Sequence, residues 1–230
     1  MINQNIFLQF LYLLSTQEIS QSLYLEGGAA LSFVYGLNRV FSNDLDFTID
    51  SDQLRPSLSV AVKEIMTLID IGQPRLCESG NNQIIIKDGQ RTVLQLDVYV
   101  LPAQLFLWEE RVLRYGRREF TLKVHSLMDI LAEKISNLFQ EDRCEFKDIV
   151  DINNIFNLLG QSFNQASFKS YLRQKLIGKK IYPRIKNNPA QSFLARKANF
   201  LKSFSASTGL SHKVFSQEFS RCQVLISQCL

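Results

Sequence analysis

Two carboxylates, Asp44 and Asp46, lie two residues apart in the apolar stretch NDLDF. Side chains alternate along a β-strand, so both carboxylates project from one face while Leu45 and Phe47 project from the other. Two carboxylates held side by side repel each other unless a cation lies between them. Oxygen ligands without His or Cys nearby suit a hard ion, so the pattern favours Mg²⁺.

A pair of glycines, Gly27 and Gly28, precedes these acids, between a short apolar strand over 23–25 and a helix expected over 29–37. Glycine lets the backbone turn tightly and approach a ligand closely, and the N–H groups at a helix N-terminus attract anions. The glycines therefore predict a phosphate site facing the carboxylates. The alternative is a tight turn without a ligand.

The order of Gly-Gly, fifteen residues and Asp-x-Asp resembles the nucleotidyltransferase superfamily that includes DNA polymerase β. The fuller pattern is similar to the AbiEii/AbiGii toxin-type nucleotidyltransferases and the related MenT toxins. It consists of GGAALSFVYGL, RVFSNDLDF, and AEK with R-x-x-x-KD-x-x-D downstream. The resemblance covers about residues 7–151. It implies a polymerase-β-like fold and transfer of NMP from an NTP to an acceptor hydroxyl, in the toxin of a toxin–antitoxin or phage-defence system.

The superfamily pattern needs a third acid on a neighbouring strand, and Asp97 in VLQLDVYV supplies it. Strand alternation turns Asp97 away from the apolar residues expected in the core, which are Leu94, Leu96, Val98 and Val100. Asp44, Asp46 and Asp97 are therefore the expected ligands of two Mg²⁺ ions. One ion would activate the acceptor hydroxyl and the other would neutralise the pyrophosphate leaving group.

The resemblance also implies nucleotide contacts outside the three acids. Ser42 could donate its hydroxyl to a phosphate or make a local turn bond. Lys134 is expected to reach the triphosphate, the alternative being a solvated lysine paired with Glu133 or Asp142. Asp148 is expected to be a catalytic acid, although an acid at a helix N-terminus is also favoured by the helix dipole.

Two residues depart from the family pattern: Lys147 replaces Arg and Ala29 replaces Thr. Lysine cannot offer the planar, bidentate fork of arginine. Neither change affects a metal ligand, so activity is still expected, with a possible difference in base or phosphate preference.

Charge is divided unevenly along the chain. Residues 1–151 contain 14 Lys and Arg against 21 Asp and Glu, a net of −7, whereas residues 152–230 contain 12 against one, a net of +11. A basic half joined to an acidic, metal-binding half suggests that the basic half holds a polyanion such as tRNA or another RNA. The alternative is a solvated helical surface.

The element pattern predicts an α+β fold with a mixed sheet flanked by helices, followed by a helical domain. A catalytic domain is expected over 1–125 and a basic helical domain over 126–230, where the hydrophobic period becomes helical. A helix is expected over 7–15, and two or three basic helices are expected at the end of the chain, with breaks at Pro183 and Pro189.

No stretch approaches 18 consecutive apolar residues, and the N-terminus lacks the features of a signal peptide. We therefore expect a cytoplasmic protein without membrane contact, and the resemblance adds a cognate antitoxin as partner. Two other functions compete: a nucleotidyltransferase acting on a small molecule or a protein hydroxyl, and a non-catalytic nucleotide- or RNA-binding module. Three converging carboxylates disfavour the binding module.

Overall fold

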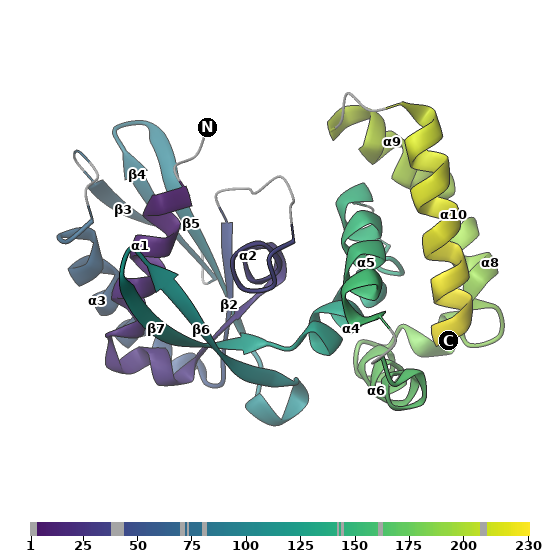
Figure 1. The fold of residues 1–230 in the computed structure, drawn as a ribbon, viewed down its shortest axis with the longest axis horizontal. Coiled ribbons are helices and arrows are strands. Elements are labelled where there is room, and N and C mark those ends of the chain that lie inside the picture. The colour runs from purple at the N-terminus through teal and green to yellow at the C-terminus, as the bar shows by residue number, and fades with distance from the viewer. Residues whose placement is uncertain are drawn as a thin grey trace. The chain divides into compact units, whose positions relative to one another are not determined.

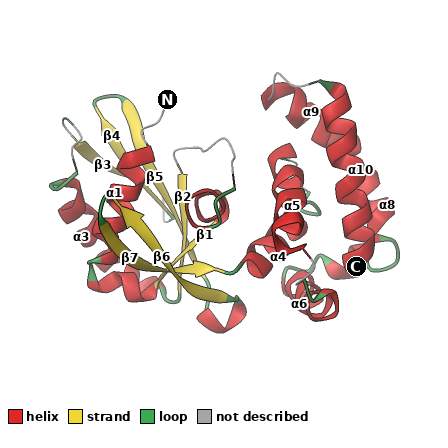
Figure 2. Cartoon of the chain, in the orientation of Figure 1, coloured by secondary structure: helices red, strands yellow, loops and turns green. Residues whose placement is uncertain are grey.

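The chain forms two compact units, Met1–Ser126 and Leu127–Leu230, which are described separately. The structure is a computed structural model. It describes residues 4–37, 44–69, 72, 74–79, 82–141, 143, 145–160, 163–207 and 211–230. The first unit contains the sheet and the second is helical (Figures 1 and 2). The predicted α+β class is confirmed.

The first unit is built on a seven-stranded sheet with the order β3-β4-β5-β2-β1-β7-β6. Strand β1 pairs antiparallel with β2, whereas β2–β5 and β1–β7 are parallel, so the sheet is mixed as predicted. The strands are β1 (Leu23–Glu26), β2 (Asp44–Ile49), β3 (Pro74–Ser79), β4 (Gln83–Asp88), β5 (Arg91–Val100), β6 (Trp108–Tyr115) and β7 (Arg118–His125).

One face of the sheet is apolar and buried. Along β2, Leu45 and Phe47 are buried while Asp44 and Asp46 on the other face are only half-buried. Strand β5 repeats this alternation, with Leu94, Leu96 and Val98 buried and Asp97 half-buried. Val100 was expected in the core but is 41% exposed, because it lies three residues beyond Asp97, where the pairing of β5 with β4 ends.

Two helices, α1 (Gln4–Ser15) and α3 (Arg55–Met66), complete the hydrophobic core of this unit. Helix α1 contacts β6, β7 and α3, and four of its large side chains are fully buried. Pro56 lies in the first turn of α3, where a missing N–H costs little. The buried side chains of α1 are Phe7, Phe10, Leu11 and Leu14.

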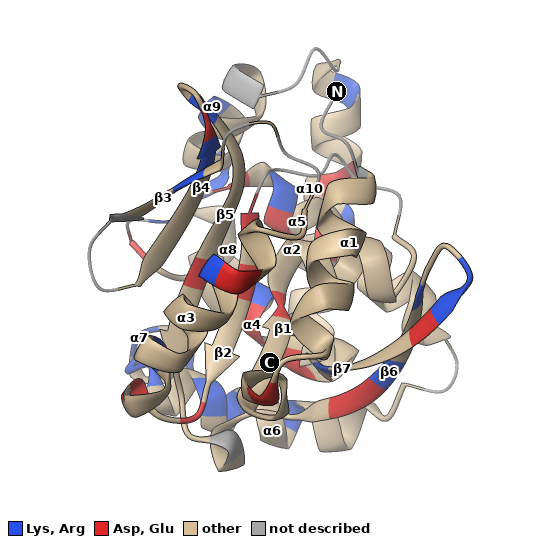
Figure 3. Cartoon of the chain, turned by 90° about the vertical axis from the view of Figure 1, so that its left-hand side faces the viewer, with Lys and Arg blue, Asp and Glu red and all other residues tan. Residues whose placement is uncertain are grey.

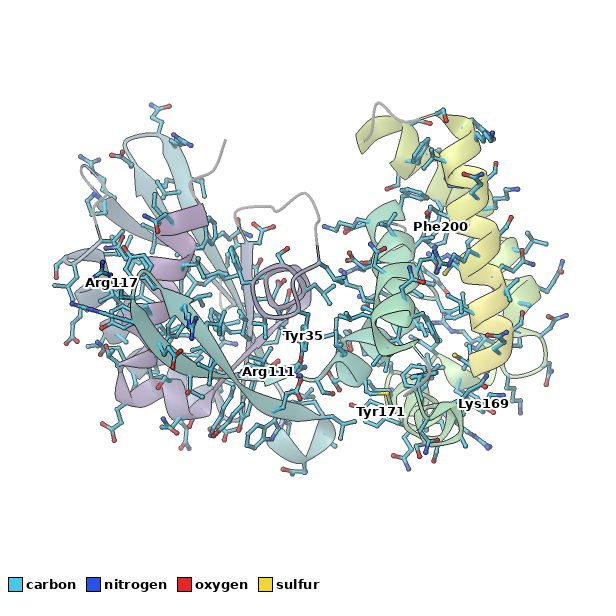
Figure 4. The ribbon with its side chains drawn as sticks, viewed as in Figure 1. Tyr35, Arg111, Arg117, Lys169, Tyr171 and Phe200 are labelled. Carbon is cyan, nitrogen blue, oxygen red and sulfur yellow. The ribbon has the colours of Figure 1, made fainter. Side chains whose placement is uncertain are left out.

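The glycine pair opens a short helical segment, α2 (Gly27–Ala29), which continues as a π-helical turn, η2 (Ala30–Val34). The segment thus begins two residues before the predicted range of 29–37 and ends three residues before the end of that range. Phe33 stacks on Phe7 with ring centroids 6.0 Å apart. Tyr35 follows η2, and its hydroxyl lies 2.7 Å from the carbonyl oxygen of His125. Figure 4 shows Tyr35 beside Arg111, whose guanidinium lies 5.4 Å from the ring centroid.

The second unit consists of helices packed around phenylalanines. Helices α7 and α8 begin around Pro183 and Pro189, so the predicted breaks are confirmed. Among the described residues after α5, the structure has five helices rather than two or three. No helix in the described part of the chain is long and apolar enough to cross a membrane. The helices are α4 (Leu127–Asn137), α5 (Phe146–Leu159), α6 (Gln165–Gly178), α7 (Tyr182–Ile185), α8 (Pro189–Leu194), α9 (Lys197–Ser207) and α10 (His212–Cys229).

Candidate active site

Three carboxylates lie side by side on the polar face of the sheet. Asp46 on β2 is the register partner of Asp97 on β5 and of Glu26 on β1. Neighbouring strands are about 4.8 Å apart, so these side chains, which we call the carboxylate row, are immediate neighbours. Asp44 lies on the same face, two residues from Asp46, opposite Gln95. The structure thus places all three predicted acids on one face of the sheet.

Glu26 was not predicted to belong to the site. It is the last residue of β1, and its side chain is 17% exposed. Strand alternation indicates its place. Leu23 and Leu25 project to the buried face, so Glu26 projects to the opposite face, which it shares with Asp46. The expected strand ended one residue too early to include it.

His125 extends the same line of polar groups onto β7. Its Nδ1 lies 3.7 Å from Oε2 of Glu26, and the His125 ring stacks on Phe106 with centroids 4.4 Å apart. The stacked ring is buried, at 2% exposure. His125 could not be connected with the acids from the sequence, because that connection depends on the parallel pairing of β1 with β7.

Gly27 lies against the central carboxylate of the row. Its φ of +64° falls in the left-handed region, and a Cβ at this position would lie 2.4 Å from Oδ2 of Asp46. Both facts require glycine, because other residues rarely adopt this φ and no side-chain atom fits at that distance. The Gly-Gly turn therefore lets the backbone approach Asp46 directly. Gly28 follows within α2.

Replacing Gly27 with Ala is expected to displace the Asp46 carboxylate. Misplacing a catalytic group by about 1 Å can cost about 100-fold in rate, so we expect a loss of this order in nucleotidyl transfer. Gly116→Ala in the β6–β7 turn is the matched control, because its φ is +60° and nothing lies within 4 Å of its added Cβ. Kinetic assays of both folded variants measure the difference. Equal activity in the two would mean that contact with Asp46 has no effect on the reaction.

The chemistry of the carboxylate row suits a hard divalent cation. Its donors are oxygen atoms on adjacent strands, and four carboxylates including Asp44 share one face, where they repel one another unless a cation offsets their charge. Within the described ranges, no group of three His, Cys, Asp or Glu side chains is already arranged to hold a metal ion. The fit to Mg²⁺ therefore rests on the oxygen donor atoms of these residues and on the sheet face that they share.

Lys134 and Asp148, both predicted site residues, meet in the helical unit. The Nζ of Lys134 lies 2.5 Å from Oδ1 of Asp148 and 3.0 Å from Oδ2 of Asp151. All three side chains are nearly fully buried. Arg143 adds a second cation, with Nε 3.5 Å from Oδ2 of Asp148. Lys134 is therefore a buried partner of two acids rather than a solvated lysine, and Asp148 lies in the first turn of α5.

Residues 38–43 lie outside the described part of the chain, so the predicted role of Ser42 stays a prediction.

Part of the positive charge of the C-terminal helices is matched by acids of α4. Lys175 on α6 lies 2.6 Å from Asp129, and Lys179 forms an ion pair with Glu133. Tyr171, labelled on α6 in Figure 4, donates a hydrogen bond to Asp129. Burial alone would raise the pKa of Glu133, but Lys179 and Lys175 outweigh it and hold this pKa below its usual value.

The division into units also changes the charge comparison. Residues 127–230 contain 15 Lys and Arg against 8 Asp and Glu, a net of +7 rather than the +11 of residues 152–230. The helical unit is still basic. Figure 3 shows Lys and Arg on several of its elements, among them α7 and α9.

Comparison with known proteins gives a family match and several similar folds. Residues 9–210 match the family described as "Nucleotidyl transferase AbiEii toxin, Type IV TA system". Among solved structures, the chain resembles MenT4, a nucleotidyltransferase toxin from Mycobacterium tuberculosis, with a TM-score of 0.55 and 17% identity over 98% of this chain and 89% of MenT4.

A second similar structure is that of the antibiotic-resistance factor ANT(2'')-Ia, with a TM-score of 0.50 and 15% identity over 83% of this chain and all of that one. The same factor has been solved in complex with adenylyl-2''-tobramycin. At these identities the likeness shows the shared fold. No protein with a curated description matches the sequence.

Proposed function

Because the chain belongs to the AbiEii family of nucleotidyl transferase toxins, we propose that it transfers an NMP from an NTP to a hydroxyl group of RNA. The chain is a nucleotidyltransferase by family, and the proposal adds the metal, the acceptor and the residues that act. The observation that carries it is the carboxylate row on the polar face of the sheet, against the Gly-Gly turn.

In this proposal Asp44, Asp46 and Asp97 hold two Mg²⁺ ions. The metal supplies charge stabilisation for the acceptor oxygen and for the leaving group. Gly27 and Gly28 bring backbone close to the triphosphate, so that N–H groups of α2 can bind its oxygens. The acceptor oxygen bonds to the α-phosphorus as the bond to the bridging oxygen breaks and pyrophosphate leaves. The Asp97 carboxylate takes the hydroxyl proton.

The proposal also includes the other predicted contacts with the nucleotide. Lys134 and Asp148 would act on the nucleotide as a pair, since the acid holds the lysine ammonium in place at 2.5 Å. Ser42 would donate its hydroxyl to a phosphate oxygen.

An RNA acceptor, with tRNA as the first candidate, is supported by the net charge of +7 over residues 127–230. Several of these cations, such as Lys180, Lys186 and Lys202, are exposed. Lysines of this kind bind phosphates without reading base sequence. We further propose a cytoplasmic site of action, where NTP and RNA are both present, and control by a cognate antitoxin protein.

A small-molecule or protein hydroxyl is the alternative acceptor, and the resemblance to ANT(2'')-Ia is the observation that favours it. A labelling experiment separates the two. The purified protein is incubated with each α-³²P-labelled NTP and Mg²⁺, and with total RNA, an aminoglycoside or a protein extract in separate reactions.

We expect label on the RNA with at least one NTP, and none with Asp46→Asn, which controls for contaminating enzymes. Label on the aminoglycoside or on protein alone would contradict the RNA assignment. Absence of label in every reaction would contradict the proposed transfer.

A further inference from the structure

Both oxygens of the Asp97 carboxylate are held by neutral side chains. Nε2 of Gln83 donates a hydrogen bond to Oδ1 at 2.8 Å, and Nε2 of Gln95 donates one to Oδ2 at 3.0 Å. An ionised carboxylate only accepts hydrogen bonds, so each amide must present its nitrogen. Two donors on two oxygens fix the plane of the carboxylate, which a single contact would leave free to rotate.

The two glutamines approach Asp97 from sides that do not face Asp46. Gln83 is its register partner on β4, on the side opposite β2. Gln95 lies two residues earlier on β5, so it shares the face of Asp97 and approaches along the strand. The side of Asp97 that faces β2, where Asp46 lies, is not used by either amide.

The two amide donors are neutral and leave the Asp97 carboxylate able to bind a cation. Each carboxylate oxygen has about two lone-pair positions, so one hydrogen bond leaves each oxygen able to bind a cation. An amide carries no charge, whereas Lys or Arg at these positions would cancel the negative charge that attracts a metal ion. Carboxylates that bind metals are commonly oriented by hydrogen bonds of this kind from outside the metal's own ligands.

We propose that Gln83 and Gln95 are positioning residues that orient the Asp97 carboxylate toward the cation shared with Asp46. The inference rests on the proposed function, in which Asp97 binds the metal. It extends that function by assigning the groups that set the geometry of this ligand.

Competition between the amides and the metal would change the metal affinity in the opposite direction. If the amides occupied lone pairs that the metal needs, they would compete with it, and their removal would tighten metal binding. Measurement of metal affinity therefore distinguishes orientation from competition directly.

The test uses the full chain with Gln83→Met, Gln95→Met and the double variant, because methionine keeps the length of the side chain and removes the donor. Mn²⁺ is the probe, and loss of the free-ion signal in electron paramagnetic resonance gives its Kd without any turnover. Gln90→Met, in the exposed turn between β4 and β5, is the matched control. Circular dichroism confirms that each variant is folded.

We expect Kd for Mn²⁺ to rise about 10- to 100-fold in the double variant, the range usual for loss of such supporting contacts, and to stay unchanged in Gln90→Met. Each single variant should give a smaller rise. Unchanged or tighter binding in the glutamine variants, with binding abolished by Asp97→Asn, would overturn the inference alone. Wild-type protein that binds no Mn²⁺, or binding indifferent to Asp97→Asn, would overturn it together with the proposed metal site.

Discussion

Asp46→Asn is expected to lower nucleotidyl transfer at least about 100-fold while the protein stays folded. Asp46 is the central member of the carboxylate row, with register partners on both sides. The amide is nearly isosteric with the carboxylate but has no negative charge, so the change removes a charge that stabilises the transition state and alters little packing. Initial rates with a labelled NTP measure the loss.

Asp50→Asn serves as the control for this variant, because Asp50 is exposed and directly follows β2. Its activity should equal that of the wild type. A folded Asp46→Asn protein with wild-type rates would remove Asp46 from the mechanism.

Lys134→Met is expected to destabilise the helical unit by about 3–5 kcal/mol, because it leaves Asp148 and Asp151 buried without their shared cation. Lys147→Met is the matched control. Lys147 also pairs with an acid, Glu145 at 2.7 Å, but both side chains are largely exposed, and such pairs contribute at most about 1 kcal/mol.

Urea unfolding can follow the two units separately. The single tryptophan, Trp108, lies in the first unit, so its fluorescence reports on the sheet, whereas far-ultraviolet circular dichroism also reports on the helices of the second unit. We expect the circular dichroism transition of Lys134→Met to shift to lower urea without a matching shift in fluorescence. Adding Asp148→Asn to Lys134→Met should restore part of the loss. A stability equal to that of Lys147→Met would mean that the buried acids do not need Lys134.

The sequence predicted local features of the site because they depend on local rules. The two-residue spacing of Asp44 and Asp46 places them on one face wherever a strand forms, and the apolar residues around Asp97 fixed its face in the same way. The Gly-Gly pair marked the turn, and its φ of +64° at Gly27 explains why.

Features that depend on pairing between distant segments could not be predicted. His125 joins the site only through the parallel pairing of β1 with β7. Lys175 and Lys179 were counted toward an unmatched basic region, yet they pair with acids on α4, about 45 residues earlier. Charge counted along the chain says how many cations a segment contains, and only the packing of α4 on α6 shows which of them are already paired.

The contact between Gly27 and Asp46 has a consequence for how the sequence can change. A Cβ at residue 27 would occupy space that Oδ2 of Asp46 fills, so the two positions cannot vary independently while the backbone keeps its course. A side chain at 27 adopts an unfavourable φ and must also displace the Asp46 carboxylate, and only the second of these conflicts is removed when residue 46 shortens and its carboxylate is lost. In a descendant that loses catalysis, we therefore expect replacement of glycine at 27 and loss of the acid at 46 to occur together. A randomised library screened for folding alone should recover the two changes as a pair.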